Sequence, residues 1–241
     1  MVVGIVTAME SERTRIEGLL GGCGTKEALG RVFRVGTLGA NTVVLGETGI
    51  GKVHAAVGAT AMIASLHPDC LISTGVAGGA DPSLRVMDAV AGADVVYHDV
   101  DCGPGNAPGQ VQGMPPSYPG DPRLLSHARS VRAEGVRVAA GRIASGDRFV
   151  TDPAQIADIR ARFPETLAVD MESGALAQVC RIFRVPFLSF RVLSDVPGAA
   201  DGAARFAQYE HFWKTVADRS FSLIRAFLET LPPSLTPPDA P

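Results

Sequence analysis

Residues 167–180 read LAVDMESGALAQVC and indicate the fold more clearly than any other part of the chain. An apolar, strand-like run ends in two carboxylates, Asp170 and Glu172, and from Ser173 onward the apolar residues recur at helical spacing. The stretch therefore predicts a strand that gives way to a helix. Because α/β proteins bind ligands in the crevice at the carboxyl ends of their strands, we expect these carboxylates to lie beside a ligand.

The same alternation of strand and helix continues in both directions along the chain. We expect strands over 2–6, 31–35, 42–45, 70–73, 89–97, 136–144, 167–169 and 187–193. We expect helices over 53–66, 122–133, 153–162, 173–183 and 206–231, and one over 16–20 that Ser11 caps. This order predicts an α/β fold, with a central mixed sheet flanked by helices on both faces.

No internal repeat and no linker divides the chain. We therefore expect a single domain over 1–231, followed by a proline-rich, disordered tail over 232–241. Residues 103–120 contain five glycines and five prolines among 18 residues, which is typical of a surface loop and allows an active-site lid.

Composition excludes several classes of protein. The 241 residues are 46% apolar and carry 22 basic and 25 acidic side chains, a net charge of −3 without long runs of one sign. Nucleic acid and anionic membrane are therefore poor candidates as partners. No apolar run reaches the roughly 20 residues of a transmembrane helix, and no signal peptide is evident, so we expect a cytoplasmic protein.

Two glycine-containing turns, 48–52 and 74–79, follow expected strands. Glycine allows the backbone to approach a ligand closely, but neither turn matches a Walker loop or the GxGxxG pattern. A tight connection with no ligand is therefore an equally good interpretation of each turn. Four cysteines are scattered without a CxxC pair, and His98 has no second histidine at a suitable spacing, so we expect no metal.

Acidic residues follow expected strands at four places: Glu12, Asp147, Glu172 and Asp195. A lone acid at a strand end often caps a turn, and that interpretation stays open for Asp195, which Val196 and Pro197 follow. Several carboxylates at one edge of a sheet can instead divide the roles of acid and base between them.

Seven motifs give the chain a more specific resemblance. In order they are GIVTAMESE, ETGIGKVHAA, STGVAGGAD, VVYHDVD, IASGDRFV, LAVDMESGALAQVC and FRVLSDV, and they cover most of 1–231. Together they resemble the 5′-methylthioadenosine/S-adenosylhomocysteine nucleosidases of the nucleoside phosphorylase superfamily. The resemblance implies a nucleoside phosphorylase-like fold, hydrolysis of an N-ribosidic bond without a cofactor, and a homodimer in which the stretch 97–101 lies at the interface.

The resemblance also implies a role for each matching residue. Asp195 corresponds to the general acid at adenine N7, oriented by Ser194, and Glu12 to the base that polarises the attacking water, with Arg191 near that water. The remaining positions contact substrate: Glu172 binds the ribose hydroxyls, Met171 packs on the sugar, Phe149 stacks on adenine, the Val150 backbone reads its edge, and Ile50, Ala77, Gly78 and Phe206 complete the pocket. Asp170 is expected to support its turn, with a second ribose contact as the alternative.

Other functions stay open. A phosphorylase would need arginines near the glycine turns, and Arg13 and Arg15 are the nearby candidates. A nucleoside-binding module without turnover would not require an acid opposite a base. Val76, Arg148 and the loop 102–119 depart from the family pattern, and only Met114 and Tyr118 could replace the loop's missing aromatic residues. The sequence therefore does not determine which 5′ substituent the enzyme prefers, and 5′-deoxyadenosine and aminodeoxyfutalosine are alternative substrates.

Overall fold

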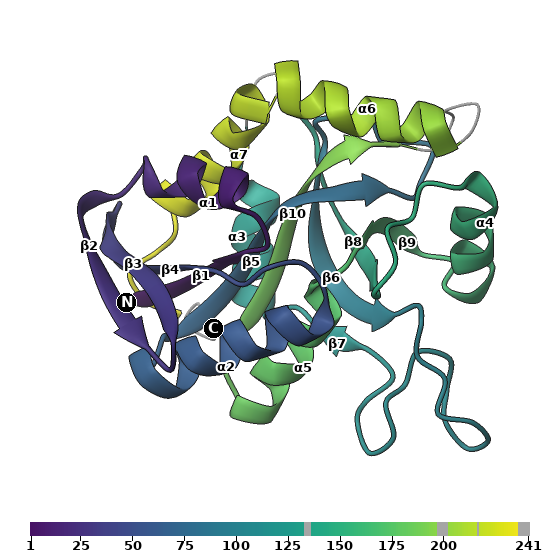
Figure 1. Ribbon diagram of the computed structural model, residues 1–241, viewed down its shortest axis with the longest axis horizontal. Helices are drawn as coiled ribbons and strands as arrows, with labels where there is room; N and C mark the ends of the chain where they lie inside the picture. The colour runs from purple at the N-terminus through teal and green to yellow at the C-terminus, as the bar shows by residue number, and fades with distance from the viewer. Residues whose placement is uncertain (133–135, 197–201, 216, 236–241) are drawn as a thin grey trace, which may run out of the picture.

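The structure is a computed structural model that describes residues 1–132, 136–196, 202–215 and 217–235. Within these residues one mixed sheet carries helices on both faces (Figure 1). The strands are β1 Val2–Thr7, β2 Gly21–Ala28, β3 Arg31–Leu38, β4 Asn41–Glu47, β5 Cys70–Gly79, β6 Ala89–Tyr97, β7 Tyr118–Pro119, β8 Val138–Ser145, β9 Thr166–Asp170 and β10 Phe187–Asp195. The helices are α1 Glu10–Glu17, α2 Lys52–Leu66, α3 Pro122–Ser130, α4 Pro153–Arg162, α5 Ser173–Phe183, α6 Gly202–Thr215 and α7 Ala217–Glu229. The predicted fold class is confirmed.

The sheet contains a closed circuit of strands. β5 pairs in parallel with β10 and antiparallel with β9, while β10 pairs with β6, β6 with β8, and β8 with β9. β1 extends the sheet from β5, and β4, β3 and β2 follow it. As a result, β1, β5, β9 and β10 bring their carboxyl ends together, although they are far apart in the sequence.

The two faces of the sheet are covered by different helices. Residues of α2 and α5, such as Met62 and Leu176, pack in one hydrophobic cluster. Residues of α1, α3, α6 and α7 pack in another, in which Phe190 of β10 stacks on Phe227 of α7 with ring centroids 4.6 Å apart. Figure 1 shows α2 and α5 below the sheet and α1, α6 and α7 above it. No helix within the described part of the chain combines the length and the apolar character needed to cross a bilayer.

Most expected elements are present, but the prediction of a glycine turn at 74–79 is wrong. It is the second half of β5, because Thr74 to Ala77 pair with β10 and Gly78 pairs with Val169 of β9. Strand β2 was not expected, because its glycines and exposed polar residues give no strand pattern.

The boundaries of two helices also differ from expectation. Ser11 does not cap α1: the helix begins at Glu10 after an extended Met9 and ends at Glu17. The single helix expected over 206–231 is two helices, α6 and α7, which run in different directions in Figure 1. In the expected tail, the carbonyl of Pro233 accepts a hydrogen bond of 3.0 Å from the N-terminal amine. Residues 236–241 lie outside the described residues, so a disordered tail stays a prediction.

Candidate active site

A pocket opens where the carboxyl ends of β1, β5, β9 and β10 meet the first turns of α1 and α5, and its empty volume is about 620 Å³ when the open solvent at its mouth is included. Eleven of the twelve residues expected at the site line it: Glu12, Ile50, Ala77, Gly78, Phe149, Val150, Met171, Glu172, Arg191, Ser194 and Asp195. The topology therefore brings together residues that are up to 183 positions apart in the sequence.

Glu12 lies in the first turn of α1, directly after β1, and is buried. Its carboxylate accepts backbone hydrogen bonds from Ala8 at 3.0 Å, Met9 at 3.1 Å and Val76 at 2.9 Å. Burial raises the pKa of Glu12, against the opposing effects of Arg191 and these amides. A raised pKa brings a carboxylate closer to the range in which it can act as a base near neutral pH.

The backbone of Gly75 and Val76 accommodates the Glu12 carboxylate. Gly75 has a φ of 142°, and a Cβ there would lie 2.2 Å from Glu12 Oε1, so only glycine fits beside the carboxylate. The neighbouring Val76 contacts Glu12 through its amide rather than its side chain. The departure from the family pattern at Val76 therefore leaves this contact unchanged.

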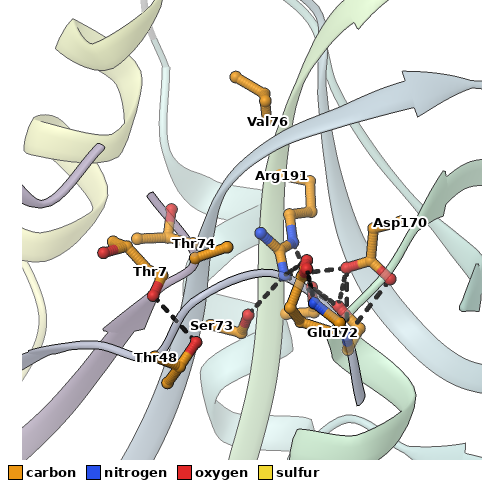
Figure 2. A network of polar contacts seen from close by, with 12 residues as sticks. Thr7, Thr48, Ser73, Thr74, Val76, Asp170, Glu172 and Arg191 are labelled. Carbon is orange, nitrogen blue, oxygen red and sulfur yellow. Dashed lines mark hydrogen bonds and ion pairs between the residues drawn. The ribbon is translucent and has the colours of Figure 1, made fainter. Parts of the chain in front are cut away.

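Arg191 is fully buried and lines the pocket, and Figure 2 shows its guanidinium with Ser73 on one side and Asp170 on the other. Its Nη2 donates to Ser73 Oγ at 2.7 Å and pairs with Asp170 at 2.9 Å and, more distantly, with Glu172 at 3.9 Å. Asp170 also accepts from the backbone amide and the hydroxyl of Ser173. Asp170 is thus both the support of its turn and the nearest counter-ion of Arg191, and the second of these contacts was not expected.

Glu172 faces the pocket from the start of α5. Its Oε1 accepts a hydrogen bond of 2.9 Å from the amide of Gly51, at the start of α2. Burial, followed by the charge of Asp170, raises the pKa of Glu172, while Arg191 opposes the shift. The glycine turn 48–52 is therefore a part of the site, because its backbone orients this carboxylate.

Asp147 links the same turn to the loop that continues into Arg148 and Phe149, which line the pocket. Its Oδ1 accepts from the amide of Lys52 at 2.7 Å, and its own amide donates to Asp99 at 2.8 Å. Asp99 in turn pairs with Lys52 Nζ at 2.8 Å. Asp147 thus caps α2 from a distant loop, the loop that continues into Phe149.

Asp195 ends β10 and lines the pocket. Ser194 Oγ donates to its Oδ1 at 2.8 Å, and the guanidinium of Arg205 contacts its Oδ2 from α6, with Nε at 2.9 Å. Burial raises the pKa of Asp195, while Arg205 and Ser194 oppose the shift. Sequence reasoning missed Arg205, because its distance from Asp195 depends on the path between β10 and α6.

Phe206 does not line the pocket. It is 46% exposed and packs edge-on against Phe149, with ring centroids 6.2 Å apart. Tyr209, three residues later and one helical turn on, lines the pocket instead, and its hydroxyl lies 3.7 Å from the sulfur of Met9. A pattern of aromatic residues in a helix does not fix which of them faces inward, so the sequence alone could not choose between them.

The expected replacements in the loop 102–119 do not reach the pocket. Tyr118 is buried in β7 and packs edge-on against Tyr97, and Met114 packs against the cluster beside α5. Arg148 does line the pocket. Arg148 and Tyr209 are therefore additions to the expected site, and the other lining residues outside the expected set are Ala8, Met9, Val76, Val169 and Asp170.

Known proteins resemble this chain over nearly its full length. A family model described as the phosphorylase superfamily matches residues 2–229. A 5′-methylthioadenosine/S-adenosylhomocysteine nucleosidase from Geobacillus kaustophilus is 40% identical over 234 residues, or 96% of this chain and 98% of that protein.

Two solved structures share its architecture. The Neisseria meningitidis nucleosidase of the same name, in complex with methylthio-immucillin-A, has a TM-score of 0.87 and 34% identity over 95% of this chain and 99% of that one. A futalosine hydrolase mutant from Helicobacter pylori has a TM-score of 0.86 and 27% identity over 96% of this chain and all of that one.

Proposed function

The chain belongs to the phosphorylase superfamily and, within it, to the 5′-methylthioadenosine/S-adenosylhomocysteine nucleosidases, and we propose that Asp195 and Glu12 carry its hydrolytic chemistry. It is an N-ribosyl hydrolase, and its substrates are 5′-methylthioadenosine, S-adenosylhomocysteine or both. The proposed roles rest on one observation: two buried carboxylates with different hydrogen-bond partners, Glu12 and Asp195, line the same pocket.

Breaking an N-ribosidic bond leaves positive charge on the sugar and negative charge on the departing base. In the proposed mechanism Asp195 donates a proton to adenine N7, and the electron pair of the broken bond stays with adenine. Glu12 accepts a proton from the water that attacks C1′, beside Arg191. Glu172 binds the ribose hydroxyls and stabilises the charge that develops on the sugar.

The other pocket residues bind the substrate. Phe149 stacks on adenine, the Val150 backbone contacts its edge, and Met171 packs on the ribose, while Ile50, Ala77 and Gly78 complete the pocket. Ser194 orients Asp195 through its hydrogen bond to Oδ1. We leave Phe206 out of this set and include Tyr209, because Tyr209 lines the pocket.

Hydrolysis is favoured over phosphorolysis by the charges around the pocket. Arg13 pairs with Glu10, Glu17 and Glu47, and Arg15 lies over the ring of Trp213, so both guanidinium groups have partners away from the pocket. Arg191 already faces Asp170, and the buried Glu12 would repel a phosphate dianion.

The test is adenine release from 5′-methylthioadenosine and S-adenosylhomocysteine, with and without phosphate. We expect equal rates and a free 5′-substituted ribose as the second product. Strict dependence on phosphate, with a ribose 1-phosphate as product, would overturn the proposal. Parallel assays with 5′-deoxyadenosine and aminodeoxyfutalosine determine the preferred 5′ substituent, a question that the similarity to a futalosine hydrolase also raises.

We further propose that the protein is a cytoplasmic homodimer. Side chains on neighbouring helices support an interface: Val53 and Val57 of α2 are 74% and 49% exposed, and Ile182 and Phe183 of α5 are 55% and 43% exposed. Figure 1 shows the two helices on the same face of the sheet. A patch of this kind is costly to leave in water and is typical of a contact surface.

A further inference from the structure

Arg205 is a buried guanidinium that contacts the carboxylate of Asp195. Only 1% of Arg205 is exposed. Its Nε lies 2.9 Å from Asp195 Oδ2, and its Nη2 contacts the same oxygen and donates to the carbonyl of Gly79 at 3.1 Å. Since Ser194 donates to Oδ1, both oxygens of Asp195 accept hydrogen bonds from side chains.

The contact is an ion pair on which Arg205 depends. Among the described residues, Asp195 is the only carboxylate within ion-pair distance of Arg205, and Arg205 Nη1 is buried without an acceptor. A buried guanidinium needs a counter-ion, because the charge has been removed from water. Arg205 therefore favours the ionised form of Asp195, and it opposes the effect of burial on the pKa of Asp195.

No second group of the pocket competes for this role. The other titratable or charged residues that line it are Glu12 of α1, Arg148 after β8, Asp170 and Glu172 around the start of α5, Arg191 of β10 and Tyr209 of α6. Arg191 is paired with Asp170, and Glu12 is bound by backbone amides. Within the described residues, none of them forms an ion pair with Asp195.

We propose that Arg205 is a positioning residue that holds Asp195 as a carboxylate in the ligand-free protein. The functional consequence rests on the proposed role of Asp195 as the general acid. Before each turnover Asp195 must then take up a proton from solvent. During bond cleavage that proton passes to adenine N7, and Arg205 stabilises the carboxylate that remains.

The sign of the pH effect follows from this arrangement. Activity that needs protonated Asp195 is present below the pKa of Asp195 and is lost as the pH rises through it. A guanidinium lowers that pKa relative to a neutral side chain at the same position. Replacing Arg205 with a neutral residue should therefore move the loss of activity to higher pH.

The first test measures Asp195 directly and does not depend on activity. In ligand-free protein labelled with ¹³C at the aspartate carboxyls, the Asp195 signal is assigned by its loss in Asp195→Asn and followed with pH. We expect an ionised Asp195 at pH 7 in the wild type, and a pKa higher by about one unit or more in Arg205→Gln. A protonated Asp195 in the wild type at pH 7 overturns the proposal, and this measurement stands even if the variant does not fold.

The second test is the pH profile of kcat/KM for the wild type, Arg205→Gln, Arg205→Lys and a control. The control is Arg142→Gln, which removes a different arginine–aspartate pair, between Arg142 and Asp94 at 2.7 Å. We expect the loss of kcat/KM at high pH to occur at a higher pH in Arg205→Gln only. The maximum kcat/KM of this variant should be about tenfold lower than that of the wild type. If kcat/KM falls equally at every pH and the pH at which activity is lost stays the same, Arg205 does not affect the protonation of Asp195. A shifted carboxyl signal without a change in the pH at which activity is lost supports the ion pair and rejects Asp195 as the general acid.

Discussion

Two neighbouring carboxylates, Asp170 and Glu172, lie at different distances from Arg191, and this difference indicates different roles. Asp170 lies 2.9 Å from the Arg191 guanidinium and has no need of a ligand, because Ser173 supplies its other hydrogen bonds. Glu172 lies 3.9 Å away and has one short contact, from the amide of Gly51. Glu172 therefore keeps capacity to accept hydrogen bonds from a substrate, whereas Asp170 mainly stabilises the site.

Substitution of Glu172 should mainly lower activity, whereas substitution of Asp170 should mainly lower stability. We expect Glu172→Gln to lower kcat/KM by about 100-fold with little change in stability, because the carboxylate proposed to bind the ribose hydroxyls is replaced by an amide. We expect Asp170→Asn to lower the free energy of unfolding by about 3 kcal/mol, because it leaves Arg191 buried without its nearest counter-ion.

Urea denaturation and steady-state kinetics on both variants check this prediction. Asp158→Asn is the control, because it removes an ion pair whose side chains are 41% and 67% exposed, and such pairs add little stability. If Asp170→Asn is as stable as the wild type, Asp170 is not the counter-ion that stabilises Arg191.

At the same scale, the sequence identified the pocket residues that belong to distinctive motifs and missed those that do not. Glu12 and Glu172 follow a strand and Asp195 ends one, each within a recognisable motif, and all three line the pocket. Tyr209 and Arg205 lie in α6, where the helix phase and the preceding path decide which side chains face inward. Local sequence does not determine either position, and it therefore predicts Phe206 in the pocket where the structure has Tyr209.

The helices α2 and α5 both cover the sheet and contribute to the pocket. Their buried sides pack on the sheet, and the start of each contributes to the pocket through Gly51 and Glu172. Their exposed apolar residues lie on the side away from the core. A second copy of the chain on this surface would cover those residues and stabilise two helix starts that contact the pocket.

Sedimentation checks the proposed dimer. We expect a species of twice the chain mass of 25.1 kDa, and we expect Val53→Glu to weaken it by placing a charge in the interface. Leu29→Glu is the matched control, because Leu29 is 72% exposed and lies in the turn between β2 and β3. A monomeric wild type with full activity would contradict the dimer.

Elements with a strong local pattern were predicted well, and those that depend on distant partners were not. The strand β6 and the helix α4 have the bounds expected from periodicity and proline positions. The second half of β5 has the composition of a turn, but it is a strand because β9 and β10, about 90 to 120 residues further on, pair with it. Such pairing is not visible in a local stretch of sequence.

For the molecule as a whole, the closed circuit of strands explains how the chemistry is assembled. Parallel pairing of β1, β5 and β10 brings their carboxyl ends to one edge, where Glu12, Glu172 and Asp195 lie. The sequence indicated that such an edge would bind a ligand, because α/β folds do so generally. It could not give the order of the strands, on which the arrangement of Glu12 and Asp195 depends.

In the proposed mechanism, Asp195 supplies the proton that releases adenine. The most direct measurement is single-turnover adenine release by the wild type and Asp195→Asn in phosphate-free buffer, alongside nucleoside affinity. We predict that the variant binds the nucleoside with an affinity within about tenfold of the wild type and releases adenine at least about 100-fold more slowly. Equal rates of release by two proteins that both bind the nucleoside would show that Asp195 is not the source of this proton.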